Sequence, residues 1–259
     1  MAYITLLSDF GLQDPTAAIA RGILLQHNPH TPIIDISHEV SPYKSYEAAY
    51  LLAATYTDFP EGSFHLILFD LFSEVRPRMA LVTYNGHYFI SADNGLLSQV
   101  LTTDLKGYLC FELQSHHSFK DWLHTAAALI SRLQQQPPEE LHLPALMLRN
   151  AKTSLTTPGN DDILNCEVIH IDHYENVILN ITRRLFDATG KGRPFTLEFM
   201  LSEEITELST HYNDVRPGNK LCRFNSDGYL EICINRGKAA SLFGLKLGSK
   251  HNNIKLTFQ

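Results

Sequence analysis

The sequence lacks most of what would assign it to several large classes of protein. Its 259 residues include only four cysteines and no CxxC pair, which excludes a zinc framework and fits a reducing compartment better than a disulfide scaffold. No run of about 18 apolar residues occurs, so we expect no transmembrane helix. The first residues lack a basic segment followed by a long apolar one, so we expect no signal peptide. These absences predict a soluble, cytoplasmic protein.

Familiar catalytic motifs are absent too. The chain has no Walker A loop, GxGxxG, GxSxG or HExxH motif. His116, His117 and His124 lack metal-site spacing with acidic partners, so no metal is expected. The 21 Lys and Arg residues against 28 Asp and Glu give a net charge of −7, which argues against a dominant nucleic-acid or acidic-membrane surface. The 44% of hydrophobic residues is enough to bury a core, which excludes a largely disordered chain.

The first half of the sequence alternates predicted strands with predicted helices. Short apolar runs that stop at polar turns predict strands at residues 3–7, 32–36, 63–70, 79–84 and 87–92. Helical spacing or propensity predicts helices at residues 16–27, 45–57, 93–100 and 121–133. This alternation predicts an α/β domain, a sheet flanked by helices.

The second half has a different pattern. The segment QQQPPEE at residues 134–140 favours an extended connector. Beyond it, plausible strands separated by turn residues predict a smaller all-β, barrel-like domain, with strands at 165–172, 176–181, 195–200, 220–225, 229–234 and 253–258. We therefore expect an N-terminal domain at 1–134, a linker at 135–160 and a C-terminal domain at 161–259.

Five polar clusters stand at the ends of apolar segments, where ligand-binding groups of α/β sheets often lie. They are residues 8–16, 70–78, 92–97, 172–176 and 225–240. Turn or helix-capping chemistry accounts for each cluster taken alone. From the residues alone, the prediction is a small-molecule enzyme or a binding protein of two domains.

At these clusters the sequence resembles a known family. Six segments run in the family's order over nearly the whole chain: ITLLSDFGLQDP (4–15), IIDISHEVSP (33–42), EAAYLLAATYTDFPEGSFHLILFD (47–70), GHYFISADNGLLSQVL (86–101), VIHIDHYENVILNI (168–181) and NSDGYLEICINRGKAASLFGLKLGS (225–249). The resemblance is to the S-adenosylmethionine (SAM) hydroxide adenosyltransferases, adenosine-forming SAM hydrolases related to fluorinating and chlorinating enzymes. It implies an N-terminal α/β domain and a C-terminal barrel-like domain.

The resemblance also implies an assembly and a ligand. The expected assembly is a homotrimer, in which the ligand lies between the N-terminal domain of one subunit and the C-terminal domain of its neighbour. SAM is the expected substrate, and neither a cofactor nor a metal is expected.

Four substrate-binding residues of the N-terminal domain follow from the resemblance. Asp9 matches the aspartate that holds the ribose hydroxyls. Asp14 and Thr16 fall near positions that meet the methionine part, and Tyr43 matches an aromatic position bordering the pocket.

Five more follow in the C-terminal domain. Asp172 matches an acidic residue near the methionine amino group, Tyr174 takes the place of a stacking aromatic residue, and Asn176 matches an amide that reads adenine. Ser226 matches a residue that contacts the methionine carboxylate. Ala239 lies in a segment whose backbone approaches adenine.

The catalytic residues depart from the family pattern. Hydrolytic members orient water with an Asp–Arg–His triad, and Asp70 fits the aspartate. The family continues Asp-Pro-Gly-Val-Gly and then two adjacent arginines, whereas in an ungapped alignment Pro77 stands at the catalytic arginine's place, between Arg76 and Arg78. Either of these arginines is a candidate to hold Asp70.

The triad histidine is replaced as well. The pattern Thr-Phe-His-Gly-Arg-Asp becomes Ser-Phe-Lys-Asp-Trp at residues 118–122, so Lys120 takes the histidine's place. A lysine accepts no proton at neutral pH unless its pKa is strongly lowered, but it donates hydrogen bonds and attracts anions. His116, His117 and His124 are alternatives with less suitable offsets.

Three functions follow from this resemblance. The first is hydrolysis of SAM to adenosine and L-methionine by a positioned water, because a sulfonium is already a good leaving group. The second is a protein that binds SAM or adenosine with little or no turnover, which the altered triad favours. The third is attack by a halide attracted by Lys120, which the negative charge of Asp70 disfavours.

Overall fold

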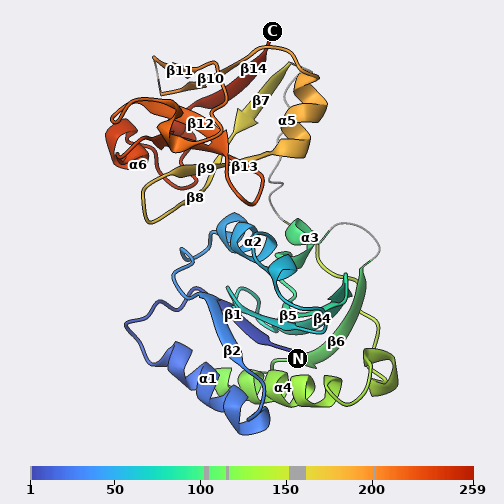
Figure 1. Ribbon diagram of the computed structural model, residues 1–259. Coiled ribbons are helices and arrows are strands. Elements are labelled where there is room, and N and C mark those ends of the chain that lie inside the picture. Colours follow the sequence, from blue (N-terminus) through green and yellow to red (C-terminus); the bar gives the residue numbers. More distant parts are fainter. Residues whose placement is uncertain (1, 102–104, 115–116, 152–161, 201) are drawn as a thin grey trace. The chain divides into compact units, whose positions relative to one another are not determined.

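The computed structural model describes residues 2–101, 105–114, 117–151, 162–200 and 202–259 (Figure 1). The chain forms two compact units, residues 1–153 and 154–259, and each is described by itself. No helix in the described ranges is long and apolar enough to cross a membrane.

A six-stranded sheet forms the centre of the N-terminal unit. In spatial order its strands are β2 (Ile33–Ser37), β1 (Ile4–Ser8), β3 (Phe64–Leu68), β5 (His87–Ala92), β4 (Arg78–Tyr84) and β6 (Lys106–Glu112). The first four are parallel, and β4 is antiparallel to both of its neighbours. The carboxyl ends of β1, β2, β3 and β5 therefore meet at one edge of the sheet, where ligand-binding groups of open α/β sheets commonly lie.

Helices cover both faces of this sheet (Figure 1). On one face α1 (Thr16–His27) packs against α4 (Phe119–Leu133). On the other face lie α2 (Ser45–Ala53) and the short α3 (Leu97–Val100). The unit also contains two one-turn helices, η1 (Tyr56–Asp58) after α2 and η2 (Pro138–Leu141) after α4.

The sequence of the central strands explains the two layers. All five residues of β1 and of β3 are buried, as in strands covered on both faces. Leu66 and Leu68 join the core cluster that contains Leu24 of α1 and Trp122 of α4, whereas Ile67 belongs to the cluster under α2 and α3. Side chains that alternate in direction along a strand thus supply two separate cores.

Part of the predicted linker packs on the N-terminal unit. The Leu109 N–H donates to the Pro144 carbonyl (2.9 Å), and the Leu146 N–H donates to the Gly107 carbonyl (2.8 Å). These bonds satisfy backbone groups on the free side of the edge strand β6, which would otherwise stay unpaired. Residues 144–146 are therefore packed against a strand, and residues 152–160 of the predicted linker lie outside the described residues.

The C-terminal unit consists of two antiparallel four-stranded sheets around one core. The first contains β11 (Glu203–Ile205), β10 (Phe195–Phe199), β14 (Ile254–Phe258) and β7 (Ile163–Cys166), in this order. The second contains β12 (Lys220–Phe224), β13 (Tyr229–Ile234), β9 (Val177–Thr182) and β8 (Val168–Ile171). The remaining helical elements are α5 (Arg183–Gly190), α6 (Ala239–Phe243), η3 (Tyr212–Asp214) and η4 (Lys250–Asn252).

The predicted fold class is confirmed: a sheet with helices in the N-terminal unit and two antiparallel sheets in the C-terminal unit. Within it, the strand predicted at residues 165–172 is wrong in one respect, because it forms β7 and β8, which belong to different sheets. The break falls at Glu167, whose N–H donates to the Asn180 side chain (2.8 Å). At this break the Glu167 N–H is bound by the side chain of Asn180, while the Glu167 carbonyl accepts from the Asn180 N–H (3.0 Å).

Candidate functional site

The turn that carries Asp9 lies at the carboxyl edge of the N-terminal sheet. Asp9 directly follows β1, and its Oδ2 accepts a hydrogen bond from the Asp70 N–H (3.1 Å). Two residues later Gly11 has φ +70, a conformation that glycine adopts without strain, and its N–H donates to the His38 carbonyl (2.7 Å). The turn after β1 is therefore tied to the ends of both neighbouring strands.

Asp9 and Asp70 form an acidic edge. Burial raises the pKa of the Asp9 carboxyl above its usual range and the charge of Asp70 raises it further, while hydrogen bonds from the backbone N–H groups of Asp70 and Asp9 act in the opposite direction. Two neighbouring carboxylates attract a positively charged ligand, and carboxylate oxygens accept hydrogen bonds from a vicinal diol. This edge suits a cation that carries a sugar.

Asp70 is held by the turn that follows β5. It follows the buried Phe69 and has φ 46, an uncommon value for a residue other than glycine. The Asn94 side-chain amide donates to the Phe69 carbonyl (2.9 Å), and its oxygen accepts from the Leu96 N–H (3.1 Å). The Asp-Asn-Gly turn of the sequence thus fixes the point at which the Asp70 loop leaves β3.

The two candidate arginines differ in their surroundings. Arg78 forms an ion pair with Asp93, whose side chain is only 1% exposed. Asp93 also accepts from the Arg149 N–H (2.8 Å). Arg76 is exposed, and among the described residues neither Arg76 nor Asp70 has an ion pair. Arg78 is therefore already paired with Asp93, which leaves Arg76 as the candidate to pair with Asp70.

Lys120 lies in the first turn of α4. A capping box begins this helix: the Ser118 hydroxyl accepts from the Asp121 N–H, and the Asp121 carboxylate accepts from the Ser118 N–H. The Phe119 ring packs edge-on against Phe10, with ring centroids 5.4 Å apart, which brings the start of α4 beside the Asp9 turn. Lys120 itself is exposed and has no ion pair within the described ranges.

The alternative histidines have other contacts. His117 Nδ1 accepts from the Gln114 N–H (3.0 Å), and the His124 and His27 rings are joined at 3.2 Å between α4 and α1. His116 lies outside the described residues. None of these contacts links a histidine to Asp70.

The other N-terminal candidates lie at the surface. Asp14 is exposed and Thr16 begins α1, whose N-cap residue is Pro15 and which has no side-chain cap. Neither Asp14 nor Thr16 therefore caps this helix with its side chain. Tyr43 is 84% exposed and has φ 65, a conformation that costs a bulky residue on the order of 1 kcal/mol.

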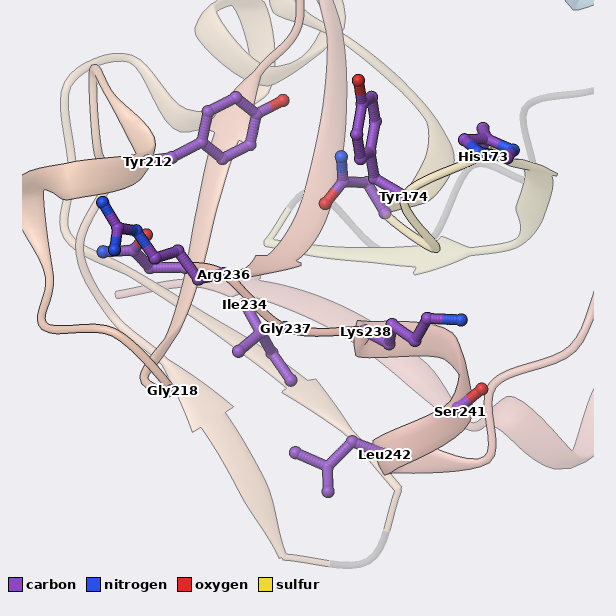
Figure 2. Close-up of a pocket in the computed structure, with 12 residues that line it drawn as sticks. His173, Tyr174, Tyr212, Gly218, Ile234, Arg236, Gly237, Lys238, Ser241 and Leu242 are labelled. Carbon is purple, nitrogen blue, oxygen red and sulfur yellow. The ribbon is translucent and has the colours of Figure 1, made fainter.

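A pocket of about 1310 Å³ lies within the C-terminal unit (Figure 2). The loop between β8 and β9 contributes His173, Tyr174 and Asn176, and the segment after β13 contributes Asn235–Lys238. Figure 2 shows the Tyr174 and Tyr212 rings on one side of the segment that runs from Ile234 to Lys238. Tyr174 is 73% exposed, so its ring face is free to stack on a planar group.

Asp172 orients Asn176. Its carboxylate accepts from both the Asn176 N–H (2.8 Å) and the Asn176 side-chain amide (2.9 Å). Because the amide nitrogen is engaged, the orientation of the side chain is fixed, and the amide oxygen has no protein partner among the described residues. Asn176, which lines the pocket, is thus prepared to accept a hydrogen bond from an amino group.

Glu175 connects the same loop to α6. Its carboxylate binds the Lys238 ammonium (2.7 Å) and accepts from the Ser241 N–H (3.0 Å), and its carbonyl accepts from the Ala240 N–H (3.0 Å). The hydrogen bonds from Lys238 and Ser241 lower the pKa of Glu175 to about 2. The carboxylate therefore stays ionised and holds the two walls of the pocket together.

Sequence reasoning missed Tyr212 as a lining residue. The Tyr212 hydroxyl donates to Glu231 (2.9 Å), and burial together with that carboxylate raises the pKa of Tyr212 to about 12. The Arg223 guanidinium lies 4.6 Å from the Tyr212 ring centroid. Tyr212 belongs to a polar loop about 40 residues after the Asp172 turn, and no sequence signal marks it. Arg236 was part of a polar cluster but had no assigned role; it is exposed with φ 56.

Ser226 and Ala239 have different relations to the pocket. Ser226 lies in the turn between β12 and β13, and the six residues of β13 separate that turn from Asn235 by roughly 20 Å at about 3.3 Å per residue. Ser226 is not among the lining residues. Ala239 is buried at the start of α6, between the lining residues Lys238 and Ser241.

Comparisons with known proteins agree with this organisation. The family model of the SAM hydroxide adenosyltransferase N-terminal domain matches residues 4–141, and that of the C-terminal domain matches residues 166–252. A (R)-S-adenosyl-L-methionine hydrolase of Thermus thermophilus is 25% identical over 272 residues, which cover 96% of this chain and 98% of the relative. A fluorinase of Nocardia brasiliensis is 24% identical, with 95% and 94% covered.

The fold has a counterpart among solved structures. The crystal structure of an uncharacterized conserved protein from Thermotoga maritima superposes with a TM-score of 0.80 at 24% identity, covering 98% of this chain and 99% of the other. At this identity the similarity concerns the fold.

Proposed function

The chain belongs to the SAM hydroxide adenosyltransferase family, and from this premise we propose that it hydrolyses SAM to adenosine and L-methionine. The relatives from Thermus thermophilus and Salinispora arenicola, both named (R)-S-adenosyl-L-methionine hydrolase, align over 96% of the chain. The observation that carries the proposal is the acidic edge, in which Asp70 lies beside the carboxylate of Asp9.

The charge of SAM fits this edge. SAM carries a sulfonium next to the ribose, and the two carboxylates favour a positive charge at that place. Asp9 accepts hydrogen bonds from the ribose hydroxyls, and the hydrogen bond that it accepts from the Asp70 N–H keeps its carboxylate in position. The ribose and the sulfonium are thereby held next to Asp70, so that C5′ lies within reach of a water bound there.

The reaction needs positioning more than covalent chemistry. The water oxygen forms a bond to C5′ while the C5′–S bond breaks, and the electron pair of that bond neutralises the sulfonium to the thioether of methionine. Asp70 orients the water and accepts its proton. The leaving group needs no acid because sulfur leaves as a neutral atom.

Arg76 and Lys120 complete the proposed catalytic set. Arg76 is assigned to hold Asp70, because Arg78 is engaged by Asp93. Lys120 is assigned to donate a hydrogen bond to the water from the start of α4, which lies beside the Asp9 turn. Its ammonium is a donor only and takes no proton in the reaction.

The C-terminal pocket is proposed to hold the adenine. The Tyr174 ring stacks on the purine, the Asn176 oxygen accepts from its amino group, and the backbone around Ala239 approaches its edge. Asp172 then acts by orienting Asn176, in addition to the expected contact with the methionine amino group. Ser226, Asp14 and Thr16 remain assigned to the methionine part.

We further propose that the complete site forms in a homotrimer, between the N-terminal unit of one subunit and the C-terminal unit of its neighbour. The exposure of Tyr43 and Tyr174 in the isolated chain supports a surface that is covered by another copy. Light scattering coupled to size-exclusion chromatography tests this: a mass of three chains is expected, and a monomer that binds and hydrolyses SAM would contradict it.

One observation favours a second function, binding of SAM or adenosine with little turnover. Within the described ranges no basic side chain is paired with Asp70. A carboxylate without such a partner is oriented less strictly, and water alignment is what the reaction depends on.

The test is incubation of the purified protein with SAM, with adenosine and methionine followed by chromatography. Asp70→Asn is expected to lower kcat by about 100-fold with little change in KM, because orientation and proton acceptance act in the transition state. Glu74→Gln changes a carboxylate of the same loop that pairs with Arg149, and is expected to retain the rate. Adenosine binding without release of products above the uncatalysed rate would favour the second function.

A further inference from the structure

A chain of polar side chains, buried at Ser8 and His38 and reaching the surface at Asp35 and Arg21, connects the Asp9 turn to β2 and α1. Ser8, the last residue of β1, places its Oγ 2.6 Å from His38 Nδ1, and both side chains are buried. His38 Nε2 lies 3.1 Å from Asp35 Oδ1, and the Arg21 Nε donates to the same oxygen (3.0 Å). We call these four residues the His38 chain. It ends one residue before Asp9.

The protonation of the His38 chain follows from its surroundings. Burial, and then the charge of Arg21, lower the pKa of His38, so the ring is neutral at pH 7. His38 Nε2 forms no hydrogen bond within the described residues, but the Asp35 carboxylate 3.1 Å away favours the proton on that nitrogen, since a bare lone pair would face a negative oxygen. Nδ1 then accepts from the Ser8 hydroxyl, and the Ser8 oxygen accepts from the Phe10 N–H (3.5 Å).

The backbone of the same segment forms hydrogen bonds with residues on both sides of Asp9. The His38 carbonyl accepts from the Gly11 N–H (2.7 Å), and the Val40 N–H donates to the Ser8 carbonyl (3.4 Å). His38 therefore contacts the residue before Asp9 with its ring and a residue after it with its backbone. Among the described residues, the pair of Ser8 and His38 is the side-chain hydrogen bond between the turn and the segment that follows β2.

We propose that His38 is a positioning residue: through Ser8 it fixes the backbone of the Asp9 turn, so that the Asp9 carboxylate meets the ribose hydroxyls. The inference rests on the proposed function in one respect, the binding of an adenosine moiety by Asp9. It adds to that function a buried partner that never touches the ligand.

The chain offers a matched comparison. Thr5 Oγ1 lies 2.8 Å from His65 Nδ1, which is also a buried hydroxyl–imidazole pair between neighbouring strands. His65 in turn contacts His87 (3.1 Å), inside the sheet and away from its carboxyl edge. Thr5→Val removes a hydroxyl from a histidine there, just as Ser8→Ala does at the Asp9 turn.

The experiment measures adenosine binding by isothermal titration calorimetry, together with Tm. His38→Leu is expected to raise Kd about tenfold and Ser8→Ala several-fold, whereas Thr5→Val lowers Tm and leaves Kd unchanged. His38→Asn, whose amide oxygen can accept from Ser8 near the place of Nδ1, is expected to restore most of the affinity. A purely structural role would lower affinity in proportion to Tm for all of them.

A double-mutant cycle with Asp9→Asn decides whether His38 acts through Asp9. If it does, His38→Leu or Ser8→Ala changes Kd little once Asp9 is replaced. Additive effects, or an unchanged Kd in both single variants, would overturn the inference. Ser8→Ala carries the cycle if His38→Leu does not fold.

The same measurements separate the inference from the proposed reaction. Wild-type protein that binds adenosine but releases no products from SAM removes the hydrolase function and leaves the role of His38 intact. SAM turnover at the wild-type rate and KM in Ser8→Ala and His38→Leu supports the reaction and overturns the role. Wild-type protein without affinity for adenosine overturns both.

Discussion

The acidic edge and the C-terminal pocket are held together in different ways. The groups at the edge come from parts of the chain that are far apart in the sequence: Asp9 is hydrogen-bonded to Asp70, and Ser8 to His38. In the pocket, by contrast, Asp172 fixes Asn176 within one short turn. The geometry of the edge therefore depends on the assembled sheet, whereas much of the pocket depends on local turn chemistry.

Charge distinguishes the two regions as well. The edge carries two neighbouring carboxylates, and the pocket is lined by Arg236 and Lys238, of which only Lys238 has an ion-pair partner among the described residues. In the proposed function, the edge faces the sulfonium of SAM and the pocket holds the neutral adenine. Measurements on each region test this difference.

The largest effect is expected for Asp9→Asn. The charged acceptor of two ribose hydroxyls is lost, and charge-assisted hydrogen bonds contribute about 3 kcal/mol, so the Kd for adenosine should rise about 100-fold. Calorimetric titration of both proteins measures it. An affinity within threefold of the wild type would show that the edge does not bind the ribose, and the comparison of the two regions would fail.

A second prediction concerns the pH dependence of the stability of the N-terminal unit. Burial, and then the neighbouring His87, lower the pKa of His65 to about 3. An unfolded histidine takes up a proton near its ordinary pKa of about 6.5, so the unfolded chain binds the proton that folded His65 does not. The contribution of His65 to the free energy of unfolding is therefore complete above about pH 6.5. It is lost as the pH falls, and the loss reaches about 2 kcal/mol at pH 5.

The only tryptophan of the chain provides the measurement. Trp122 is buried in the core of the N-terminal unit, so its fluorescence in urea reports unfolding there. The urea midpoint is expected to fall between pH 7 and pH 5. Hydrogen exchange in β9 and β13 is the control, since Glu175, with a pKa of about 2, loses its contribution only below about pH 4.5. A constant midpoint would contradict the prediction.

The third prediction tests the local character of the pocket. Asp172→Ala frees the Asn176 amide to rotate, and we expect a loss of about 1.4 kcal/mol in adenosine binding, a tenfold rise in Kd. Tm should change little, because the turn is at the surface. Asp187→Ala, an exposed carboxylate on α5, serves as the matched control and should bind like the wild type. Equal losses in both variants would deny Asn176 its role.

The difference between the regions also explains how much the sequence could predict. The Asp172–Asn176 turn follows from turn chemistry within a few residues, and the strands predicted at 79–84 and 87–92 are present and pair across the Asn85-Gly86 turn. The alternation of apolar and helical segments was sufficient for the fold class. The helix at residues 16–27 has the predicted bounds.

Contacts between distant residues could not be predicted in this way. The bonds from Ser8 to His38 and from Asn94 to the Phe69 carbonyl join segments 25 to 30 residues apart, and no local pattern encodes them. The pairing of Arg78 with Asp93 is of the same kind, and only the folded sheet shows that it withdraws Arg78 from Asp70. The strand β6 was missed, because its mostly half-buried residues give no clear alternation.

The smallest effect is expected for Arg236→Gln, and its sign is informative. Arg236 lies at the pocket without an ion-pair partner in the described ranges, and SAM carries a net positive charge. If the pocket holds adenine, removal of this cation relieves a repulsion of about 0.5 kcal/mol across roughly 10 Å of solvent-exposed space at low salt. SAM should then bind about twofold more tightly, and neutral adenosine should bind as before. Weaker binding of SAM, with adenosine unchanged, would place the methionine carboxylate beside Arg236 and reverse the assignment of the two regions.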